Sequence, residues 1–329
     1  MKRTLLLIAL LAGVGLFGPL LAPYETISSA DPVALRLLPP GTHVSALMTQ
    51  DGQLLPIAGW DSAAPGTLLR EWHVEGDELV YRRGPRKRRL TLATLRRDEE
   101  GQPELHDLVF PAGTDRYGRD LLSRLLVGGR TSLAVGFLAV LVAGVLGAAG
   151  GLLSGLLGRG MDLILSRLSD AFLATPRIVL LMVVAALFRP SPWGLALLIG
   201  ATGWPVFTRL VRAETHALAD GEMVLAARAA GVSTWRLAWR HILPHVATVV
   251  LVAAGLRLGP FILLEASLSF LGFGVTPPEP SWGNILAEGR DVLFEAWWVA
   301  TLPGLLLGAT VMLANAAADG TRKAVAARG

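Results

Sequence analysis

Two charged residues inside an apolar stretch are the side chains whose position most suggests chemistry. Arg257 and Glu265 lie in the hydrophobic run that starts near Val246. Charges within a membrane segment usually face the interior of a bundle or a water-filled path. Eight residues separate the two, about 12 Å along a helix, so they do not pair directly. Two interpretations of Glu265 stay open. It lines a path, where it could be the proton site of an ion-driven secondary transporter, or it marks the outer end of the span.

The other reactive residue types form no complete catalytic or metal-binding set. Asp115 and Asp120 have intervening glycines but fit no full calcium loop. An external turn is favoured there, with an aspartate capping the helix that begins near Asp120. His241 and His245 straddle Pro244, which spoils a shared helical face for a metal. The chain has no cysteine, no phosphate-binding loop and no nucleophile–base–orienter set. We therefore predict no catalytic residue, metal or cofactor, and a protein that is not an enzyme.

The composition indicates a membrane protein. Of the 329 residues, 52% are hydrophobic and 17% are charged, and the mean hydropathy is +0.52. A soluble domain carries about a quarter charged residues, so an ordinary soluble enzyme is excluded, as is a disordered chain. The net charge of +4 fits Lys and Arg on cytoplasmic loops. We therefore predict the lipid bilayer as a partner and no nucleic acid.

Six stretches are long and apolar enough to cross a bilayer, which takes about 20 residues. They are Thr4–Leu21, Thr131–Leu157, Ala171–Phe188, Trp193–Leu210, the run from Val246 past Leu264, and Ala296–Ala316. The first is interpreted as an uncleaved signal-anchor, because its apolar run is long and Pro19 and Pro23 mark a helix end. The predicted fold is an all-α polytopic membrane protein with six transmembrane helices and a small external insertion.

A glycine stripe in the second span predicts close helix packing. Gly147, Gly151 and Gly155 recur every four residues. Small residues at this spacing let another membrane helix approach closely. Mere flexibility is the less favoured explanation of so regular a pattern.

Basic residues in the short loops predict the orientation. Lys2 and Arg3 place the N-terminus in the cytoplasm, and six spans return the C-terminus there. The segment 23–130 is then external, and residues 43–107 within it form a β-rich insertion with a turn signal at Gly76–Asp77. The chain therefore divides into an N-terminal helix (1–22), an extracytoplasmic segment (23–130), a five-helix transmembrane domain (131–318) and a cytoplasmic tail (319–329).

The cytoplasmic loop 212–244 carries the most informative pattern. An alanine-rich segment that favours a helix is followed by Gly231, which suits a left-handed C-terminal cap. Ser233 or Thr234 caps the next helix, and Pro244 separates that helix from the fifth span. Two short helices are therefore predicted to meet at a glycine turn between two transmembrane helices.

The surface of this loop favours a docking element. Ala226, Ala227 and Ala230 leave a shallow surface, while Trp235 and Trp239 share a face of the second helix. Such a surface suits a knob seated in a partner's groove. A DNA-binding helix–turn–helix needs a free recognition helix, whereas this one is held between two membrane spans.

Three motifs resemble those of a known family, in the same order. Ala226-Ala227, then Gly231, then Leu243-Pro244 is similar to the EAA motif of membrane subunits of binding-protein-dependent ABC importers. The segments Gly113–Arg124 and Glu265–Gly283 closely resemble the dipeptide, oligopeptide and nickel permease group, specifically its "C"-type subunit.

The resemblance covers residues 1–40 and 107–329. It implies a type I ABC importer permease fold in a bacterial plasma membrane, forming half of a pore for peptides or a related solute such as nickel. It also implies three partners: one or more ATPase subunits, a second homologous permease subunit and an extracytoplasmic solute-binding protein. The residues that the motif assigns to ATPase coupling are Glu222, Leu225, Ala226, Ala227, Gly231, Leu243 and Pro244, with Ala226 and Ala227 facing the ATPase. Arg257 and Glu265 are the candidates for lining the path.

Two features depart from the family pattern. The acidic position that gives the motif its name is Leu225 here, with Glu222 three residues earlier, which weakens an acidic contact but leaves a shape-based dock. The insertion 43–107 is longer than the family's usual loop. A solvated decoration is the favoured interpretation of it, beside a docking surface for an external partner or the working part of a membrane-anchored assembly protein.

Overall fold

The protein folds into two compact units, each containing parts distant in the sequence. The computed structural model describes residues 13, 17–26, 29, 32, 35–51, 53–56, 59–60, 68–69, 72–83, 86–97 and 103–326. The helical unit takes in Gly129–Pro277 and Leu305–Gly329, and the second unit takes in Phe17–Gly128 and Pro278–Gly304. The predicted first span, Thr4–Leu21, lies almost entirely outside the described residues; within them it ends in the short 3₁₀ helix η1 (Gly18–Leu21).

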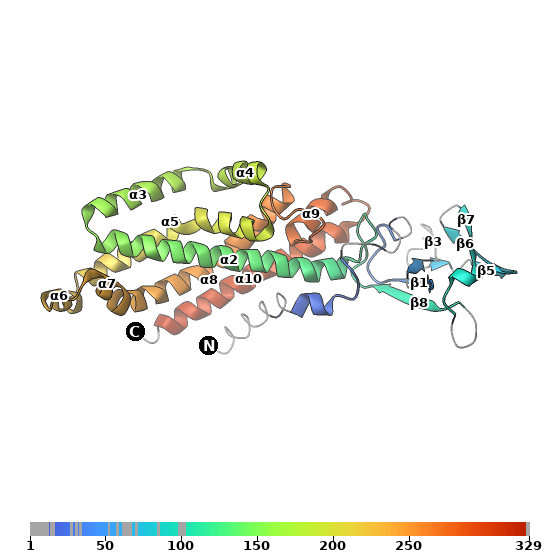
Figure 1. Cartoon of the computed structure of the whole chain (residues 1–329), viewed down its shortest axis with the longest axis horizontal. Helices are drawn as coiled ribbons and strands as arrows, with labels where there is room; N and C mark the ends of the chain where they lie inside the picture. The colour runs from blue at the N-terminus through green and yellow to red at the C-terminus, as the bar shows by residue number, and fades with distance from the viewer. Residues whose placement is uncertain are drawn as a thin grey trace. The chain divides into compact units, whose positions relative to one another are not determined.

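Four helices in the described chain are long and apolar enough to cross a membrane, and a bent pair forms a fifth candidate. They are α2 (Leu121–Leu156), α5 (Pro192–Ala219), the helix over Thr234–Phe270 that includes α8 (Leu243–Phe270), and α10 (Trp297–Ala326) (Figure 1). Each coincides with one predicted span. The all-α polytopic fold is therefore confirmed for this part of the chain.

The predicted third span is not one continuous helix. Residues 171–188 are divided between α3 (Arg159–Ala174) and α4 (Arg177–Phe188), which are bent by 85° relative to each other. Pro176 explains the break, because a proline disfavours helical backbone at the preceding residue. Thr175 is accordingly extended, with φ −84° and ψ 131°. Hydrophobicity alone predicted an unbroken span here and did not account for the proline.

The glycine stripe of α2 is packed against α5, as predicted. A Cβ atom on Gly147 would lie 2.2 Å from Cβ of Phe207, and one on Gly151 would lie 2.5 Å from Cβ of Val211. A Cβ atom on Gly155 would lie 2.4 Å from Thr215. Only hydrogen atoms fit at these positions, so the backbones of the two helices approach closely.

The second unit contains the β-rich insertion, as predicted. Strand β1 (Thr42–Met48) pairs antiparallel with β2 (Leu54–Pro56) and with β8 (Leu105–Phe110). Strands β5 (Trp72–Glu75) and β6 (Glu78–Arg83) form a hairpin through Gly76, whose φ is +65°, and β7 (Arg86–Thr91) pairs with β6. The short strands β3 (Gly59–Trp60) and β4 (Leu68–Leu69) pair with each other.

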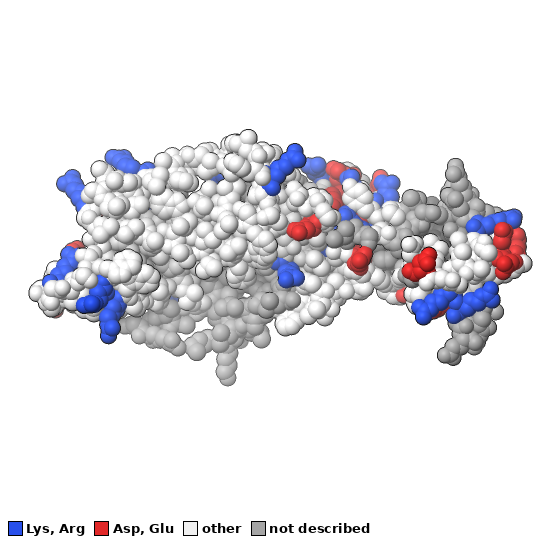
Figure 2. Space-filling model, in the orientation of Figure 1, with Lys and Arg blue, Asp and Glu red and all other residues white. Residues whose placement is uncertain are grey.

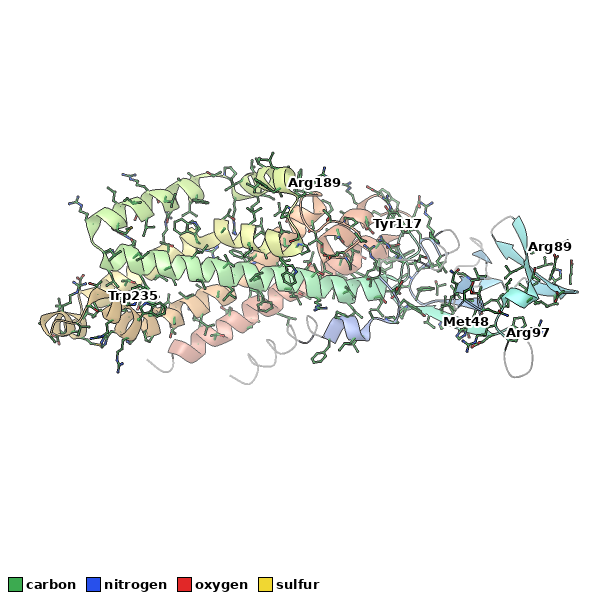
Figure 3. All side chains as sticks on the ribbon, in the orientation of Figure 1. Met48, Arg89, Arg97, Tyr117, Arg189 and Trp235 are labelled. Atoms are coloured by element: carbon green, nitrogen blue, oxygen red, sulfur yellow. The ribbon has the colours of Figure 1, made fainter. Side chains whose placement is uncertain are left out.

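Two small apolar clusters support these strands. One contains Leu35, Leu38, Val44, Ala46, Leu108 and Phe110. The other contains Leu47, Leu79 and Leu95. In the exposed hairpin, Arg89 lies 3.3 Å from Glu78 (Figure 3), and an ion pair as exposed as this one contributes little to stability.

Candidate functional site

The loop 212–244 folds into two short helices joined at a glycine turn, as predicted. Helix α6 (Glu222–Ala229) ends in a left-handed cap at Gly231, whose φ is +76°. The Gly231 amide donates to Arg228 O at 2.9 Å, and the Val232 amide donates to Ala227 O at 3.1 Å. These bonds satisfy carbonyl groups at the helix end. Of the two predicted caps for the next helix, Ser233 is the one used by α7 (Thr234–Leu237).

One face of the loop is anchored in the helical unit. Val224, Leu237 and Ile242 are fully buried in a cluster with Val211 and Val246. Ala227 is half-buried against the same cluster. Its side chain therefore supports the loop from inside, whereas Ala226 is exposed.

The other face is exposed and strongly apolar. Trp235 is 69% exposed and Trp239 56% exposed, and their rings meet edge-on with centroids 5.5 Å apart. Met223 and Leu225 on α6 are about half exposed. Trp235 lies at one end of the helical unit and Arg189 toward the other (Figure 3). We call Met223, Leu225, Trp235 and Trp239 the apolar face of the loop.

Basic side chains surround this end of the helical unit. Figure 2 shows them gathered over α6, α7 and the beginning of α3, while the visible face of the middle of the helical unit carries few charges. Glu222 and Gly231 are also exposed here. Such a distribution is typical of the cytoplasmic end of a membrane bundle.

Pro244 does not separate α7 from the fifth span, contrary to expectation. A π-helical turn, η3 (Ala238–Ile242), leads directly into α8, where Pro244 occupies the first turn. The missing N–H of proline is tolerated at that position. The Leu243 amide donates to Ala238 O, five residues back, as in a π-helical turn. Leu243 is half-buried and Pro244 is exposed.

An ion pair fixes the base of the loop. Arg212 of α5 donates two hydrogen bonds to Asp162 of α3, one of them at 2.6 Å from Nη2 to Oδ2. Ser154 of α2 also donates to Asp162. A two-point guanidinium–carboxylate contact sets orientation as well as distance. Three helices are therefore tied together where the chain enters the loop.

The two predicted pathway charges lie in different surroundings. Glu265 is 0% exposed, and its Oε1 accepts a hydrogen bond from Ser269 at 2.7 Å. The Ser269 hydroxyl in turn accepts from the Val275 amide at 2.9 Å. Glu265 therefore holds the chain that follows α8. Arg257 is exposed midway along α8, which continues through Gly259–Pro260.

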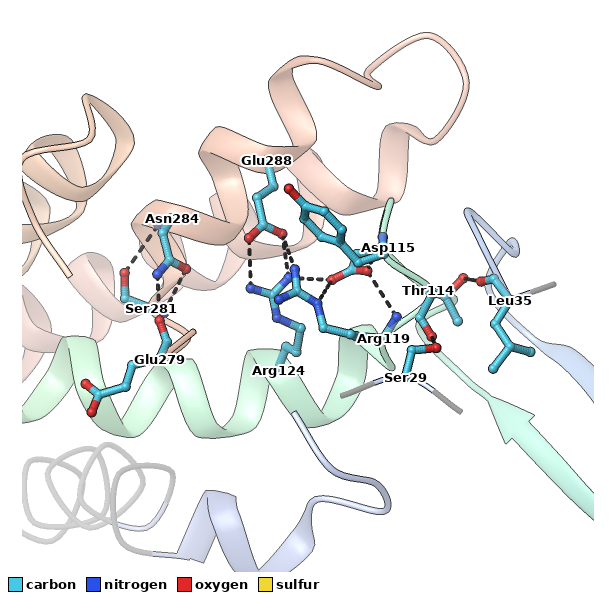
Figure 4. A network of polar contacts seen from close by, with 12 residues as sticks. Ser29, Leu35, Thr114, Asp115, Arg119, Arg124, Glu279, Ser281, Asn284 and Glu288 are labelled. Atoms are coloured by element: carbon cyan, nitrogen blue, oxygen red, sulfur yellow. Dashed lines mark hydrogen bonds and ion pairs between the residues drawn. The ribbon is translucent and has the colours of Figure 1, made fainter. Parts of the chain in front are cut away.

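The turn before α2 is held by a buried cluster of four charges (Figure 4). Asp115 accepts from Arg119 Nε at 2.7 Å and from Arg124 Nη1 at 2.5 Å. Its other oxygen accepts from the amides of Tyr117 and Arg119. Glu288 of α9 (Trp282–Arg290) accepts from both arginines, so two positive charges meet two negative charges. The oxygens of Asp115 are thus occupied by nitrogen donors.

Asp120 caps α2, as predicted. Its Oδ2 accepts from the Ser123 amide at 2.7 Å. Burial is the main cause that raises the pKa of the Asp120 carboxyl above its ordinary value of 3.8. Among the described residues, no group of three or more histidine, aspartate or glutamate side chains is placed to hold a metal ion.

Three charged residues with several polar contacts were not singled out from the sequence. Glu288, Asp162 and Arg177 each have an ion-pair or hydrogen-bond partner 22 to 169 residues away, where no spacing rule applies. The sequence offered one signal for them, because each is a charged residue in or near an apolar segment. A charge in such a place usually has a protein partner or a functional role. That criterion was applied only to the fifth span.

The fold is that of a multi-pass membrane protein. It combines a bundle of apolar helices with a helical loop that has an exposed apolar face, and charges lie inside the spans. A family model described as "Binding-protein-dependent transport system inner membrane component" matches residues 129–328. The chain belongs to this family, and it is a transporter permease subunit.

Individual proteins of known name are also similar to this chain. The dipeptide transport system permease protein DppC of Alkalihalophilus pseudofirmus is 38% identical over 65% of this chain and 70% of that protein. The glutathione transport system permease protein GsiD of Pectobacterium atrosepticum is 38% identical over 69% of this chain and 74% of that protein. Among solved structures, an inward-facing MetNI methionine ABC transporter matches 61% of this chain and 96% of the other, with a TM-score of 0.49 and 20% identity.

Proposed function

We propose that this chain forms half of the translocation pore of an ATP-driven importer, and that a separate ATPase subunit drives it through the loop 212–244. The observation that carries the proposal is the two-sided construction of the loop. Val224, Leu237 and Ile242 anchor it in the bundle, while the apolar face has no covering within the described chain. When an exposed apolar surface of a rigid element docks in a partner's groove, a movement of the partner can be transmitted to the helices that anchor the element.

The details of the loop refine which residues meet the ATPase. Ala226 is exposed beside Leu225, so both belong to the contact surface. Ala227 supports the loop from below, and Gly231 sets the turn. Because Leu225 replaces the usual acid, the contact depends on shape and apolar burial more than on charge. Glu222, exposed at the start of α6, supplies the remaining acidic group.

The proposed cargo is a peptide or a peptide-like solute, with nickel as an alternative within the same group. The relatives named for dipeptide and glutathione transport support the peptide. An extracytoplasmic binding protein would deliver the cargo, and a second homologous permease would complete the pore. Both termini and the loop 212–244 would face the cytoplasm, as the basic residues around α6 and α7 suggest. Arg257 is proposed to line the path, while Glu265 holds the outer end of α8.

Cysteine cross-linking tests the coupling, since the chain has no cysteine of its own. In the complete importer, Ala226→Cys is expected to cross-link to the ATPase subunit, with a yield that changes when ATP is added. Phe294→Cys, fully exposed in the other unit, is the matched control and should not cross-link. If Ala226→Cys captures no ATPase while the purified complex contains one, the coupling assignment is wrong.

A second experiment tests transport itself. Ala226→Trp enlarges the contact surface without disturbing the buried side of the loop, so ATP-driven dipeptide uptake should fall while ATP hydrolysis and membrane insertion persist. Normal uptake by this variant would contradict the coupling role. Uptake in vesicles that contain an ion gradient but no ATP would instead favour a secondary transporter.

A further inference from the structure

The break between α3 and α4 exposes irregular backbone at the middle depth of the bundle. Arg177, the first residue of α4, contacts Thr202, ten residues into α5 and therefore about 15 Å from its start. Half the thickness of a bilayer core is also about 15 Å. Thr175 and Pro176 at the break are exposed in this chain. Non-helical backbone at such a depth is tolerated only where protein or water covers it.

Arg177 is held rigidly at this break without a negative partner. Its Nη2 donates to Ile199 O at 2.5 Å and its Nε donates to Thr202 at 3.2 Å. The guanidinium lies 4.5 Å from the ring centroid of Phe261. A Cβ atom on Gly203 would lie 2.8 Å from Nη2, so the glycine makes room for the charge. Among the described residues, no carboxylate pairs with Arg177.

Arg257 brings a second positive charge to the same place. It precedes Phe261 by one helical turn and therefore lies on the same face of α8. It is exposed, about 20 Å from either end of α8, and forms no ion pair within the described part of the chain. Such a charge does not face lipid tails, because its burial in hydrocarbon is expensive.

We propose that Arg177 and Arg257 form a carboxylate-binding station on the translocation path, which takes the C-terminal carboxylate of a peptide while it crosses the membrane. This inference rests on the proposed function. The guanidinium of Arg177 is fixed through Nε and Nη2, which leaves Nη1 to donate to a carboxylate. Arg257 adds a second positive charge on an exposed side chain. Two neighbouring positive charges favour the binding of an anion. Because the site is open to the path, the bound anion can leave it again.

The test compares a free dipeptide with its C-terminal amide. The complete importer is reconstituted in proteoliposomes, and ATP-driven uptake of dialanine and of dialanine amide is measured with the binding protein fully loaded by each. Arg257→Gln is expected to slow uptake of the free peptide by about tenfold, since the charge-assisted hydrogen bond to the carboxylate is lost. Uptake of the amide should change little, and Arg257→Lys should retain most of the rate.

Arg159→Gln, an exposed arginine at the start of α3 with no ion pair in the described chain, is the matched control and should transport both peptides normally. Equal slowing of both peptides in Arg257→Gln would overturn the inference. The arginine would then be needed for folding, or would pair with a carboxylate of the second permease subunit. An unchanged rate would overturn it as well. If the wild-type importer moves neither peptide, the proposed cargo fails, which is a separate result.

Discussion

Glu288 accepts two hydrogen bonds from Arg124, at 2.5 Å and 3.1 Å, across 164 residues of sequence. The side chain of Arg124 is only 1% exposed. A buried guanidinium needs nearly complete compensation of its charge and its donors. The pair therefore fixes α9 against the start of α2, and Asp115 and Arg119 complete the balance of charge around it.

Glu288→Gln should destabilise the protein strongly. The change leaves two buried arginines against the single carboxylate of Asp115, and breaking a buried pair costs about 3–5 kcal/mol. Denaturant unfolding in detergent, followed by tryptophan fluorescence, measures the loss. Arg290→Gln is the control, because its pair with Asp291 is exposed and its loss should cost less than about 1 kcal/mol. Equal stability of the two variants would show that the buried pair of Glu288 with Arg124 does not stabilise the fold.

Gly147→Ala should loosen the packing of α2 against α5. The new methyl group would overlap Cβ of Phe207 and approach Trp204 O at 2.9 Å. Overpacking of this kind costs about 1–3 kcal/mol. Thermal unfolding in detergent checks the expected decrease. Gly308→Ala in α10 is the matched change, since nothing lies within 4 Å of the added atom, and it should be neutral or slightly stabilising.

Gly231→Val should weaken coupling more than folding. The position needs φ +76°, which costs an L-residue about 1–2 kcal/mol and is worst for a β-branched one, although the space around it is open. The turn between α6 and α7 would then shift, and ATP-driven uptake should decrease with normal amounts of inserted protein. Gly231→Asn tolerates the left-handed conformation and should keep most of the activity. A Val variant as active as the Asn variant would exclude this role of the turn.

Asp120→Asn should alter the pH dependence of stability. The pKa of the Asp120 carboxyl is raised on folding, so the folded state favours the protonated form. Its stabilising contribution is present below the unfolded pKa and is lost as the pH rises through the folded value. Asparagine keeps the cap and remains neutral. The variant should therefore gain stability relative to wild type as the pH rises above the ordinary pKa of 3.8. A constant difference across this range would contradict the expectation.

The sequence by itself determined the elements whose signals are local. Apolar runs identified the four continuous spans of the described chain, the spacing of Gly147 and Gly151 predicted a packing surface, and Gly231 predicted a left-handed turn. Each signal depends on the periodicity or backbone freedom of neighbouring residues, so it can be read without knowing what lies elsewhere. Membership of the permease family followed from motifs of the same local kind.

Only the tertiary structure decided which charged side chains are buried and paired and which are exposed. Glu265 and Arg257 were both candidates for lining the path, yet Glu265 is buried and hydrogen-bonded by Ser269, whereas Arg257 is exposed. Arg177 gained its position from the break at Pro176 and from contacts with α5 and α8. Burial and pairing depend on groups far apart along the chain. The energy of a charge depends on these surroundings, and they exist only once the helices have packed.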